Sequence, residues 1–315
     1  MITIYNPLTY ERKNTIVKYN SAVIKKSLYS EGSIQLEMQY LPLDIGDIVL
    51  YDRYAFIIRK LTSTFTSTSI IGKDLKSLLS QRIFESEHVY EQKTAEYIVK
   101  DVAVKMLATG DRAVNNLTVE AVAATDEEKF DVTFEKSKKV SDTLNSFCAE
   151  HHISYDFKFS RDGIVFYTFA EKFNPLVKFS ARLHNLDEIE YEKSNLDLNN
   201  VFYYPHKESE DTEETIISDG TAAGIERFEG YTSETDLEKY KSEHKATESL
   251  TGTPTSKLIY DTDYTLGDIV DVEFRGLTDS LPITQVAMYF EHAKSYILPT
   301  FGTPAESKLK KILKG

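Results

Sequence analysis

The sequence predicts a fold of the α+β class that is mainly β, with two similar antiparallel β-barrel domains separated by a mixed α/β domain. Three observations lead to this prediction. Apolar and polar residues alternate at both ends of the chain, as in strands with one buried face. In the middle of the chain the apolar residues recur at helical spacing. Tyrosine and phenylalanine, which favour strands, are abundant, with 20 and 17 residues against no tryptophan.

The first β-barrel domain is expected at residues 1–92, where the sequence indicates two hairpins. Alternation over residues 21–40 around a Ser-Glu-Gly turn predicts the first hairpin, and apolar residues over 46–58 on either side of Asp-Arg predict the second. The threonine-rich and serine-rich run at residues 62–69 fits an exposed strand, because β-branched residues favour strands.

The mixed α/β domain is expected at residues 93–183. Asp74 can cap a short helix that closes the first domain, and Thr94 can cap the next helix, which is expected to stop near Gly110. A hairpin that turns at Asp162-Gly163 ends this part of the chain. Between them, a third helix carries one apolar stripe, formed by Val140, Leu144, Phe147, Cys148 and His151.

The second β-barrel domain is expected at residues 184–303, with an acidic loop at residues 208–214 and an inserted charged helix around residues 233–250. A basic C-terminal tail follows at residues 304–315. This tail is amphipathic, so membrane or partner docking is an alternative to a solvated end.

A short internal repeat links the two ends of the chain. Residues 43–49 match residues 264–270, and in each the pair Gly46-Asp47 or Gly267-Asp268 opens a strand. The similar order of strands after each pair favours the duplication of one barrel. Glycine permits a positive φ and aspartate can accept a backbone N–H, so we expect these pairs to shape turns and not to catalyse a reaction.

The composition excludes several classes of protein. With 37 basic and 50 acidic side chains, the net charge is -13, which disfavours a surface that grips nucleic acid by neutralising phosphates. No apolar run is long enough for a membrane helix, and the first residues lack the features of a secretory leader, so we expect a chain made and folded in solution. The single cysteine, Cys148, is expected to be a buried thiol.

No catalytic, cofactor-binding or metal-binding residues are predicted. His151 and His152 would point about 100° apart on a helix and cannot share one metal from the same face. We expect His151 at a helix C-terminus, where a cation is favoured. The acidic run at residues 208–214 lacks the order of a calcium loop, and Glu85, Glu87 and His88 read as a solvated loop.

Three segments, in order along the chain, resemble the motifs of a known family. Residues 72–83 resemble its G-x-D-L…L-L…R-I segment, and residues 179–201 resemble F-S…G-N-L…Y…N-V, with His184 where glycine is common. Residues 260–270 resemble its most specific stretch, Y…D-Y-x-L-G-D-I-V. On these motifs the chain resembles the tail-tip hub proteins of siphophages, also called tail-associated or baseplate hub proteins. In this chain, the residues expected to form the structural signature are Gly46, Asp47, Gly72, Asp74, Arg82, Asn185, Gly267 and Asp268.

The resemblance implies a trimeric ring with two barrels in each chain, which presents six similar units to a sixfold tail tube. It also implies a non-enzymatic virion structural protein at the tail tip, made in the host bacterial cytoplasm. The implied partners are further copies of the chain, a distal tail or tail-tube protein, a fibre or receptor-binding protein and the tape-measure protein. DNA would pass through without specific binding. Some relatives carry a C-terminal hydrolase or fibre, and we expect neither after Gly315.

Two alternatives stay open at the level of the sequence. One is a tail-associated peptidoglycan hydrolase. The other is the hub of a contractile tail or of an injection device built on the same barrels.

Overall fold

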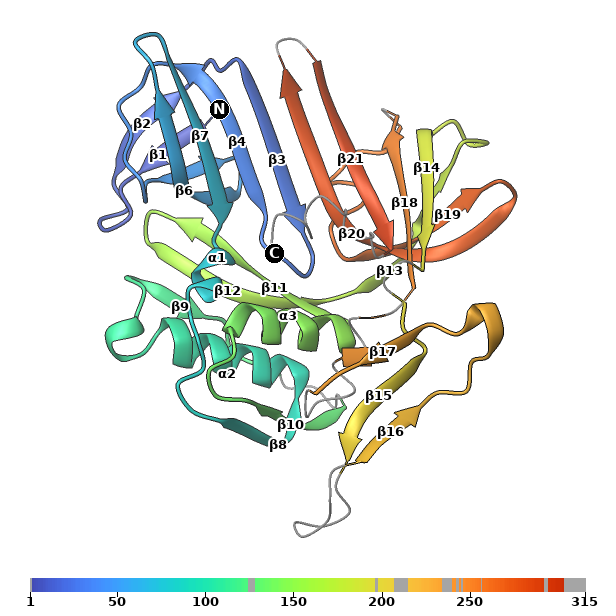
Figure 1. The fold of residues 1–315 in the computed structure, drawn as a ribbon. Helices are drawn as coiled ribbons and strands as arrows, with labels where there is room; N and C mark the ends of the chain where they lie inside the picture. The colour runs from blue at the N-terminus through green and yellow to red at the C-terminus, as the bar shows by residue number, and fades with distance from the viewer. Residues whose placement is uncertain are drawn as a thin grey trace. The chain divides into compact units, whose positions relative to one another are not determined.

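The computed structural model describes residues 2–123, 128–195, 198–206, 215–233, 240–241, 244, 246–255, 257–291 and 294–302. The chain forms two compact units, the larger being Met1–Ile189 with Gly252–Thr300 and the smaller Glu190–Thr251 with Phe301–Gly315 (Figure 1). The finer division into domains at residues 92, 183 and 303 stays a prediction.

Most of the chain is strand, as predicted, and thirteen strands form the largest sheet. Those near the N-terminus are β1 (Ile2–Tyr5), β2 (Arg12–Ile16), β3 (Ser21–Ser27), β4 (Ser33–Gln39), β5 (Ile48–Tyr51), β6 (Tyr54–Ser63) and β7 (Ser67–Asp74). Those near the C-terminus are β13 (Lys172–Ser180), β14 (Leu186–Ser194), β18 (Thr247–Pro254), β19 (Asp268–Phe274), β20 (Leu277–Glu291) and β21 (Lys294–Gly302).

These strands fall into two sets with the same order of neighbours. One set runs β3-β4-β7-β6-β5-β1, and the other runs β14-β18-β21-β20-β19-β13. Both sets also use their strands in the same succession along the chain, so that β3 corresponds to β14 and β6 to β20. We call the two sets the N-terminal copy and the C-terminal copy. The strand order therefore repeats, as the paired Gly-Asp segments predict.

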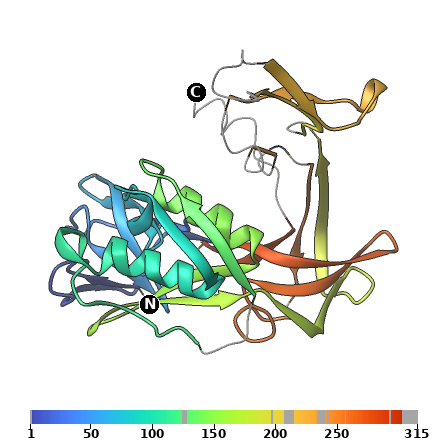
Figure 2. The same ribbon diagram turned by 90° about the horizontal axis from the view of Figure 1, so that it is seen from below.

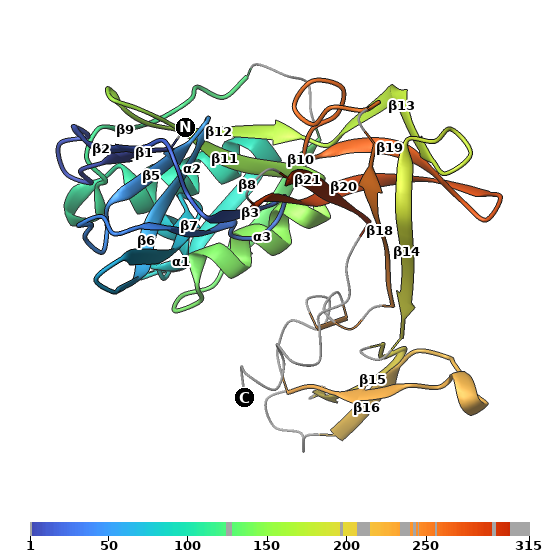
Figure 3. The ribbon, with the colours of Figure 1, turned by 90° about the horizontal axis from the view of Figure 1, so that it is seen from above.

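The two copies are joined edge to edge in one sheet. The second half of β20, Gln285–Glu291, pairs antiparallel with β3, and Figure 3 shows the two strands side by side. Among the strands that the structure describes, no ladder closes either copy into a barrel. The mainly β fold is therefore confirmed, while the architecture of two similar antiparallel β-barrel domains stays a prediction. The 15 residues of β20 divide between β19 of its own copy and β3 of the other.

The mixed α/β segment between the copies is layered. Helices α2 and α3 lie between a sheet of β9, β11 and β12 and the β8–β10 pair (Figures 1 and 2). The elements are α1 (Ser77–Ser80), β8 (His88–Thr94), α2 (Ala95–Leu107), η1 (Gly110–Arg112), β9 (Leu117–Val119), β10 (Lys129–Phe134), α3 (Val140–Glu150), β11 (Ile153–Ser160) and β12 (Gly163–Ala170).

The helices follow the predicted pattern closely. The Thr94 hydroxyl caps α2 by accepting the Tyr97 N–H at 3.3 Å, and one face of the helix, including Ile98 and Val102, is fully buried. The stripe of α3 is buried as well, with Cys148 only 1% exposed. The hairpin at Asp162-Gly163 is confirmed by the β11–β12 ladder.

Two local predictions were wrong. Asp74 does not cap α1, which has Lys76 at its N-cap position without a side-chain cap; instead the carboxylate is buried against Lys26. The run at residues 62–69 is not one strand, because β6 ends at Ser63 and β7 begins at Ser67. A hydroxyl turn separates them, in which Thr64 Oγ1 accepts the Ser67 N–H at 3.0 Å.

The smaller unit holds a sheet of β16 (Thr215–Asp219), β15 (Val201–His206) and β17 (Glu229–Tyr231), with η2 (Gly224–Glu226) before β17. The acidic loop at 208–214 and the tail at 304–315 lie outside the described residues, as does most of the helix expected at 233–250, whose end from Thr247 is strand β18. Within the described ranges, no helix is long and apolar enough to cross a membrane.

Candidate functional site

The Gly-Asp turn of the N-terminal copy is held by hydrogen bonds from both of its residues. Gly46 has a φ of +97°, and its N–H donates to the Ile58 carbonyl on β6 at 2.9 Å. The Asp47 carboxylate accepts the Asp44 N–H at 3.0 Å, and the Asp47 N–H donates to the Asp44 carbonyl at 3.2 Å. The turn therefore fixes where β5 starts and how it faces β6.

The turn of the C-terminal copy has the same geometry. Gly267 has a φ of +92°, and its N–H donates to the Ile283 carbonyl on β20 at 3.0 Å. The Asp268 carboxylate accepts the Thr265 N–H at 3.0 Å, and the Asp268 N–H donates to the Thr265 carbonyl at 3.2 Å. This equivalence also aligns Ile283 with Ile58, and so β20 with β6.

The surroundings of the two turns differ. Asp47 is buried and forms an ion pair with Lys13 at 2.8 Å, whereas Asp268 accepts a hydrogen bond from the amide of Asn174 at 3.0 Å. The neighbouring strand also differs, since β1 runs antiparallel to β5 but β13 runs parallel to β19. The turn is thus specified by its own residues and not by the strand beside it.

The junction between the copies is a seven-residue ladder with a buried apolar face. Its side chains include Ala22 and Ile24 from β3 and Val286 and Met288 from β20, all 4% exposed or less. Phe290, also in the ladder, packs its ring on Tyr51 of β5 with centroids 5.1 Å apart. Burial of this kind stabilises the contact by roughly 25 cal/mol for each Å² of apolar surface removed from water.

A buried charged cluster lies behind this junction. Lys26 on β3 forms ion pairs with Asp74 on β7 and with Asp156 on β11, each at 3.0 Å. Burial favours neutral Lys26, but the two carboxylates outweigh it and raise its pKa. Burial would also raise the pKa of Asp156, yet Lys26 and Lys76 hold it below the usual range. The cluster therefore connects the N-terminal copy to the mixed segment through groups that stay charged.

The cluster also constrains two neighbouring residues outside the signature, Gly32 and Lys76. A Cβ on Gly32 would lie 2.6 Å from the Asp74 carboxylate, so the turn before β4 must leave room for this side chain. Lys76 is buried beside the cluster and donates to the carbonyls of Ser27 and Leu28 at 2.9 and 2.8 Å. Burial lowers its pKa.

The other signature residues shape separate turns and strand crossings. Gly72 lies on β7 between β4 and β6, where a Cβ would lie 2.8 Å from an Ile34 methyl group. Arg82 donates to the carbonyl of Met106 at 3.3 Å. Asn185 closes the turn after β13 by accepting the Ser180 N–H at 2.8 Å. They therefore form no common cleft with the Gly-Asp turns.

His184 stands where the motif commonly has glycine. Its φ is +53°, in the left-handed region that glycine adopts at least cost. The position therefore keeps the backbone of the motif although the residue differs.

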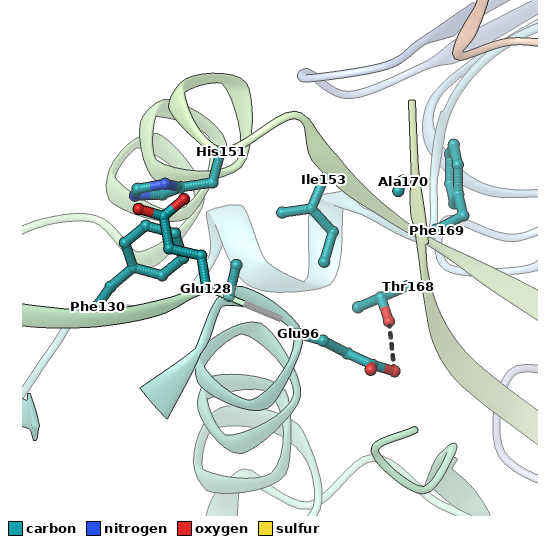
Figure 4. Close-up of a pocket in the computed structure, with 9 residues that line it drawn as sticks. Glu96, Glu128, Phe130, His151, Ile153, Thr168, Phe169 and Ala170 are labelled. Atoms are coloured by element: carbon teal, nitrogen blue, oxygen red, sulfur yellow. Dashed lines mark hydrogen bonds between the residues drawn. The ribbon is translucent and has the colours of Figure 1, made fainter. Parts of the chain in front are cut away.

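A cavity of about 370 Å³ opens beside α2 and α3 (Figure 4). The Glu96 carboxylate at this cavity already has hydrogen-bond partners. It accepts hydrogen bonds from Thr168 Oγ1 at 3.3 Å, from the Ala123 N–H at 3.1 Å and from Lys100. His151 packs against Phe130 with centroids 4.0 Å apart, and burial lowers its pKa. The predicted place of His151 at a helix C-terminus is confirmed, since it is the C-cap residue of α3, but burial against aromatic rings works against the charge that a helix end favours.

Other candidate chemistry is equally weak. Burial raises the pKa of Cys148 to about 12, so its thiol is protonated at neutral pH and a poor nucleophile. Across the part of the chain that the structure describes, no group of three His, Cys, Asp or Glu side chains could hold a metal ion. The organised features of the molecule are therefore its repeated turns, the β3–β20 junction and the charged cluster behind it.

A match to a family model assigns the chain to a protein family. Residues 69–303 match the model described as Siphovirus ReqiPepy6 Gp37-like protein. The chain belongs to this family. The predicted resemblance to siphophage tail proteins is confirmed, and the match covers the last strand of the N-terminal copy, the mixed segment and the C-terminal copy. No curated protein matches the chain by sequence.

Solved structures share the fold at low sequence identity. The 43 kDa tail protein of prophage MuSo2 from Shewanella oneidensis matches with a TM-score of 0.60 and 12% identity, over 95% of this chain and 97% of that one. Prophage tail protein gp18 from Listeria monocytogenes EGD-e matches with a TM-score of 0.57 and 13% identity, over 100% and 99%. A chain of the p2 virion baseplate in its activated conformation matches with a TM-score of 0.52 and 10% identity, over 97% and 99%.

Sequence reasoning missed the buried charged cluster. Lys26 is one of two adjacent lysines on a strand with alternating exposure, and its place in line with Ala22 and Ile24 was the available signal, because an inward-facing charge needs a partner. Asp156 lies between aromatic residues in the polar register of β11, so the alternation gave no signal there. The β3–β20 pairing left no comparable signal.

Proposed function

We propose that this protein is a non-enzymatic structural component of a phage or prophage tail tip, a baseplate hub that assembles as a trimeric ring. The ring closes the tail tube and anchors the apparatus that adsorbs to the host. The observation that carries the proposal is the β3–β20 junction between two copies of one strand order.

The junction supports a ring because it joins strands from different positions of the repeated order, as a heterologous contact does. One copy contributes the strand in the β6 position and the other contributes the strand in the β3 position. A head-to-tail contact that repeats with closure generates a ring. Three chains with two copies each would present six similar units, which matches a sixfold tube; each copy would then behave as the predicted barrel-like unit of the ring.

The partners follow from that position in the tail. We propose a distal tail or tail-tube protein on one side, a fibre or receptor-binding protein on the other, and the tape-measure protein in the lumen. The shared fold with a p2 virion baseplate chain supports a place among other tail components. With a net charge of -13, the lumen would let DNA pass without adhesion.

The domain division follows the same logic. We propose 1–92 and 184–303 as the two ring-forming domains, with 93–183 as the domain between them and 304–315 as a tail.

The absence of a catalytic role is supported by Glu96 and His151, which are engaged or neutral in the described cavity.

Immunogold labelling of virions tests the proposal. An antibody against the chain should label one end of the tail, and deletion of its gene should yield particles without an adsorption apparatus. Label on the capsid, or normal tails without the gene, would refute a hub. Release of muropeptides from cell walls by the purified chain would favour the hydrolase, and a contractile sheath on the labelled particles would favour the other tail type.

A further inference from the structure

Three side chains of the buried charged cluster are arranged so that two of them can react. Lys26 Nζ on β3 lies 3.0 Å from an Asp74 oxygen on β7 and 3.0 Å from an Asp156 oxygen on β11. Lys26 is 4% exposed and Asp74 is 1% exposed, so their contact is shielded from bulk water. An amine and a carboxyl group held together where water is excluded can condense to an amide while a third group carries the proton.

The backbone makes room for this contact. Strands β3 and β7 are not neighbours, because β4 lies between them (Figure 1). Gly32 stands directly before β4, and a Cβ there would lie 2.6 Å from Asp74 Oδ2 and 2.6 Å from the Lys25 carbonyl. The Gly32 carbonyl also accepts the Asp74 N–H at 3.1 Å. Because this position has no side chain, Lys26 and Asp74 can meet beyond the start of β4.

One oxygen of Asp74 is poorly accommodated as part of a carboxylate. Asp74 Oδ1 is buried and has no hydrogen-bond partner among the described residues. A buried anionic oxygen without a donor is costly, because it has lost water and gained no replacement. An amide oxygen carries only a partial charge, so conversion of the carboxylate to an amide would lower this cost.

We propose that Lys26 and Asp74 condense to an intramolecular isopeptide bond, with Asp156 as the proton carrier. The new bond joins Lys26 Nζ to Asp74 Cγ, and the bond from Cγ to one carboxylate oxygen breaks. Two of the three ammonium protons leave with that oxygen as one molecule of water, and the third stays on the amide nitrogen. The step needs no further reactant, and Asp156 ends in the state in which it began.

The charges of the cluster make the reaction slow. Lys26 and Asp74 are charged until they react, and the two carboxylates raise the pKa of Lys26, so its neutral amine is scarce. The ammonium proton nevertheless has an acceptor in Asp156 at 3.0 Å. Only the folded chain brings the three groups together, so we expect the bond to appear gradually after folding.

The bond would fasten the strand that joins the two copies. Lys26 and Asp74 are 48 positions apart, so the bond would close a long loop and tie β3 to β7 across β4. A cross-link of this kind restricts the unfolded chain. Since β3 also carries the ladder to β20, the cross-link would hold one side of the junction in place. This inference does not depend on the hub role.

Intact mass spectrometry of the full-length chain, followed over time after purification, tests the bond. We expect the unaltered chain to lose the mass of one water molecule. Lys26→Arg keeps a cation but has no primary amine, and Asp156→Asn cannot carry the proton, so both should keep their full mass. Lys25→Arg, at an exposed position of the same strand, is the matched control and should lose water as the unaltered chain does.

Peptide mapping locates the loss, because an Asp-Gly pair such as Asp162-Gly163 can also lose water as a succinimide. Trypsin cuts after lysine but not after a lysine whose amine is acylated. In the linked chain, the tripeptide Asp74–Lys76 should therefore remain attached to a peptide that is uncut at Lys26.

The proposal is overturned if the unaltered chain keeps its full mass throughout, if the loss maps to any other position, or if Asp156→Asn forms the bond at the same rate. Circular dichroism shows whether each variant folds. If Lys26→Arg or Asp156→Asn does not fold, the mass and the peptide map of the unaltered chain decide alone.

Discussion

The two copies of the strand order differ most at one edge. In the C-terminal copy, β20 pairs along seven residues with a strand of the other copy, while Lys60–Ser63 of β6 pairs with β7 alone among the described strands. The Gly-Asp turns that start both hairpins nevertheless agree in φ, in the bond from the glycine N–H to the opposite strand and in the bond from the aspartate N–H. The comparison shows that the turn is repeated from its own residues, whereas the pairing of the strand edge differs between the copies.

The largest expected effect comes from removing the cation of the buried charged cluster behind the β3–β20 junction. Lys26→Met should lower the free energy of unfolding by about 3–5 kcal/mol, because Asp74 and Asp156 stay buried without their cation. Chemical denaturation measures the loss. Lys25→Met, exposed on the same strand, is the matched control and should change stability little. Equal losses in the two variants would show that the cluster does not stabilise the junction.

Asp156→Asn should cost about 2 kcal/mol at neutral pH, since Lys26 loses a charged partner. The folded pKa of Asp156 is lowered, so its contribution is present above the unfolded value of about 3.9 and is lost as the pH falls through the folded value. Urea unfolding should therefore show the gap to the unaltered protein narrowing below about pH 4. A gap that is constant with pH, or the same gap in the exposed control Asp162→Asn, would contradict this.

The two glycine turns sharpen the comparison directly. Gly267→Ala should cost about 2–3 kcal/mol and Gly46→Ala about 1 kcal/mol, because both need a positive φ. Only at Gly267 would the new methyl group also meet Phe169 at 3.1 Å and Leu28 at 3.3 Å. Thermal and urea unfolding of the pair decide the order. A larger loss at Gly46 would mean that crowding at the second turn is relieved easily.

Replacing the aspartate of each turn by asparagine should lower the free energy of unfolding, and only in the N-terminal copy should this loss depend on salt. Asp47→Asn loses the ion pair to Lys13 and should cost about 1 kcal/mol in dilute buffer and less in 1 M salt. Asp268→Asn keeps an acceptor for Thr265 and loses no ion pair in the described contacts, so its cost should not depend on salt. Unfolding at two salt concentrations tests this, and equal salt dependence would contradict the assigned partners.

The smallest effect concerns the segment between the copies. Cys148 is 1% exposed and its pKa is raised to about 12, so a thiol reagent at neutral pH should label it only after unfolding. Mass spectrometry of the native and the urea-unfolded chain measures this. Rapid labelling of the native chain would show that α3 opens independently of both copies.

The sequence predicted the local parts of this picture well. The hairpins, the Thr94 cap and the buried stripe of α3 are each specified by residues close together in the chain, and the repeated Gly-Asp pair revealed the duplication. The β3–β20 junction could not be predicted, because strands more than 250 residues apart pair through backbone groups that every sequence shares. For the same reason the sequence did not reveal that the two expected barrel domains share one sheet.

The candidate site was predicted only in part. The turn residues were found because glycine and aspartate have distinctive backbone chemistry, whereas Asp74 was assigned to a cap because its neighbours suggested a helix start. Its true partner, Lys26, lies 48 residues away. His151 was placed correctly at the end of α3, but its charge depends on Phe130 and Phe147, which the helix alone does not reveal.

Electron microscopy of the purified chain bound to its tail-tube partner tests the central claim most directly. We expect a threefold ring with six similar lobes. A twofold particle, or a single chain bound to the tube, would contradict it.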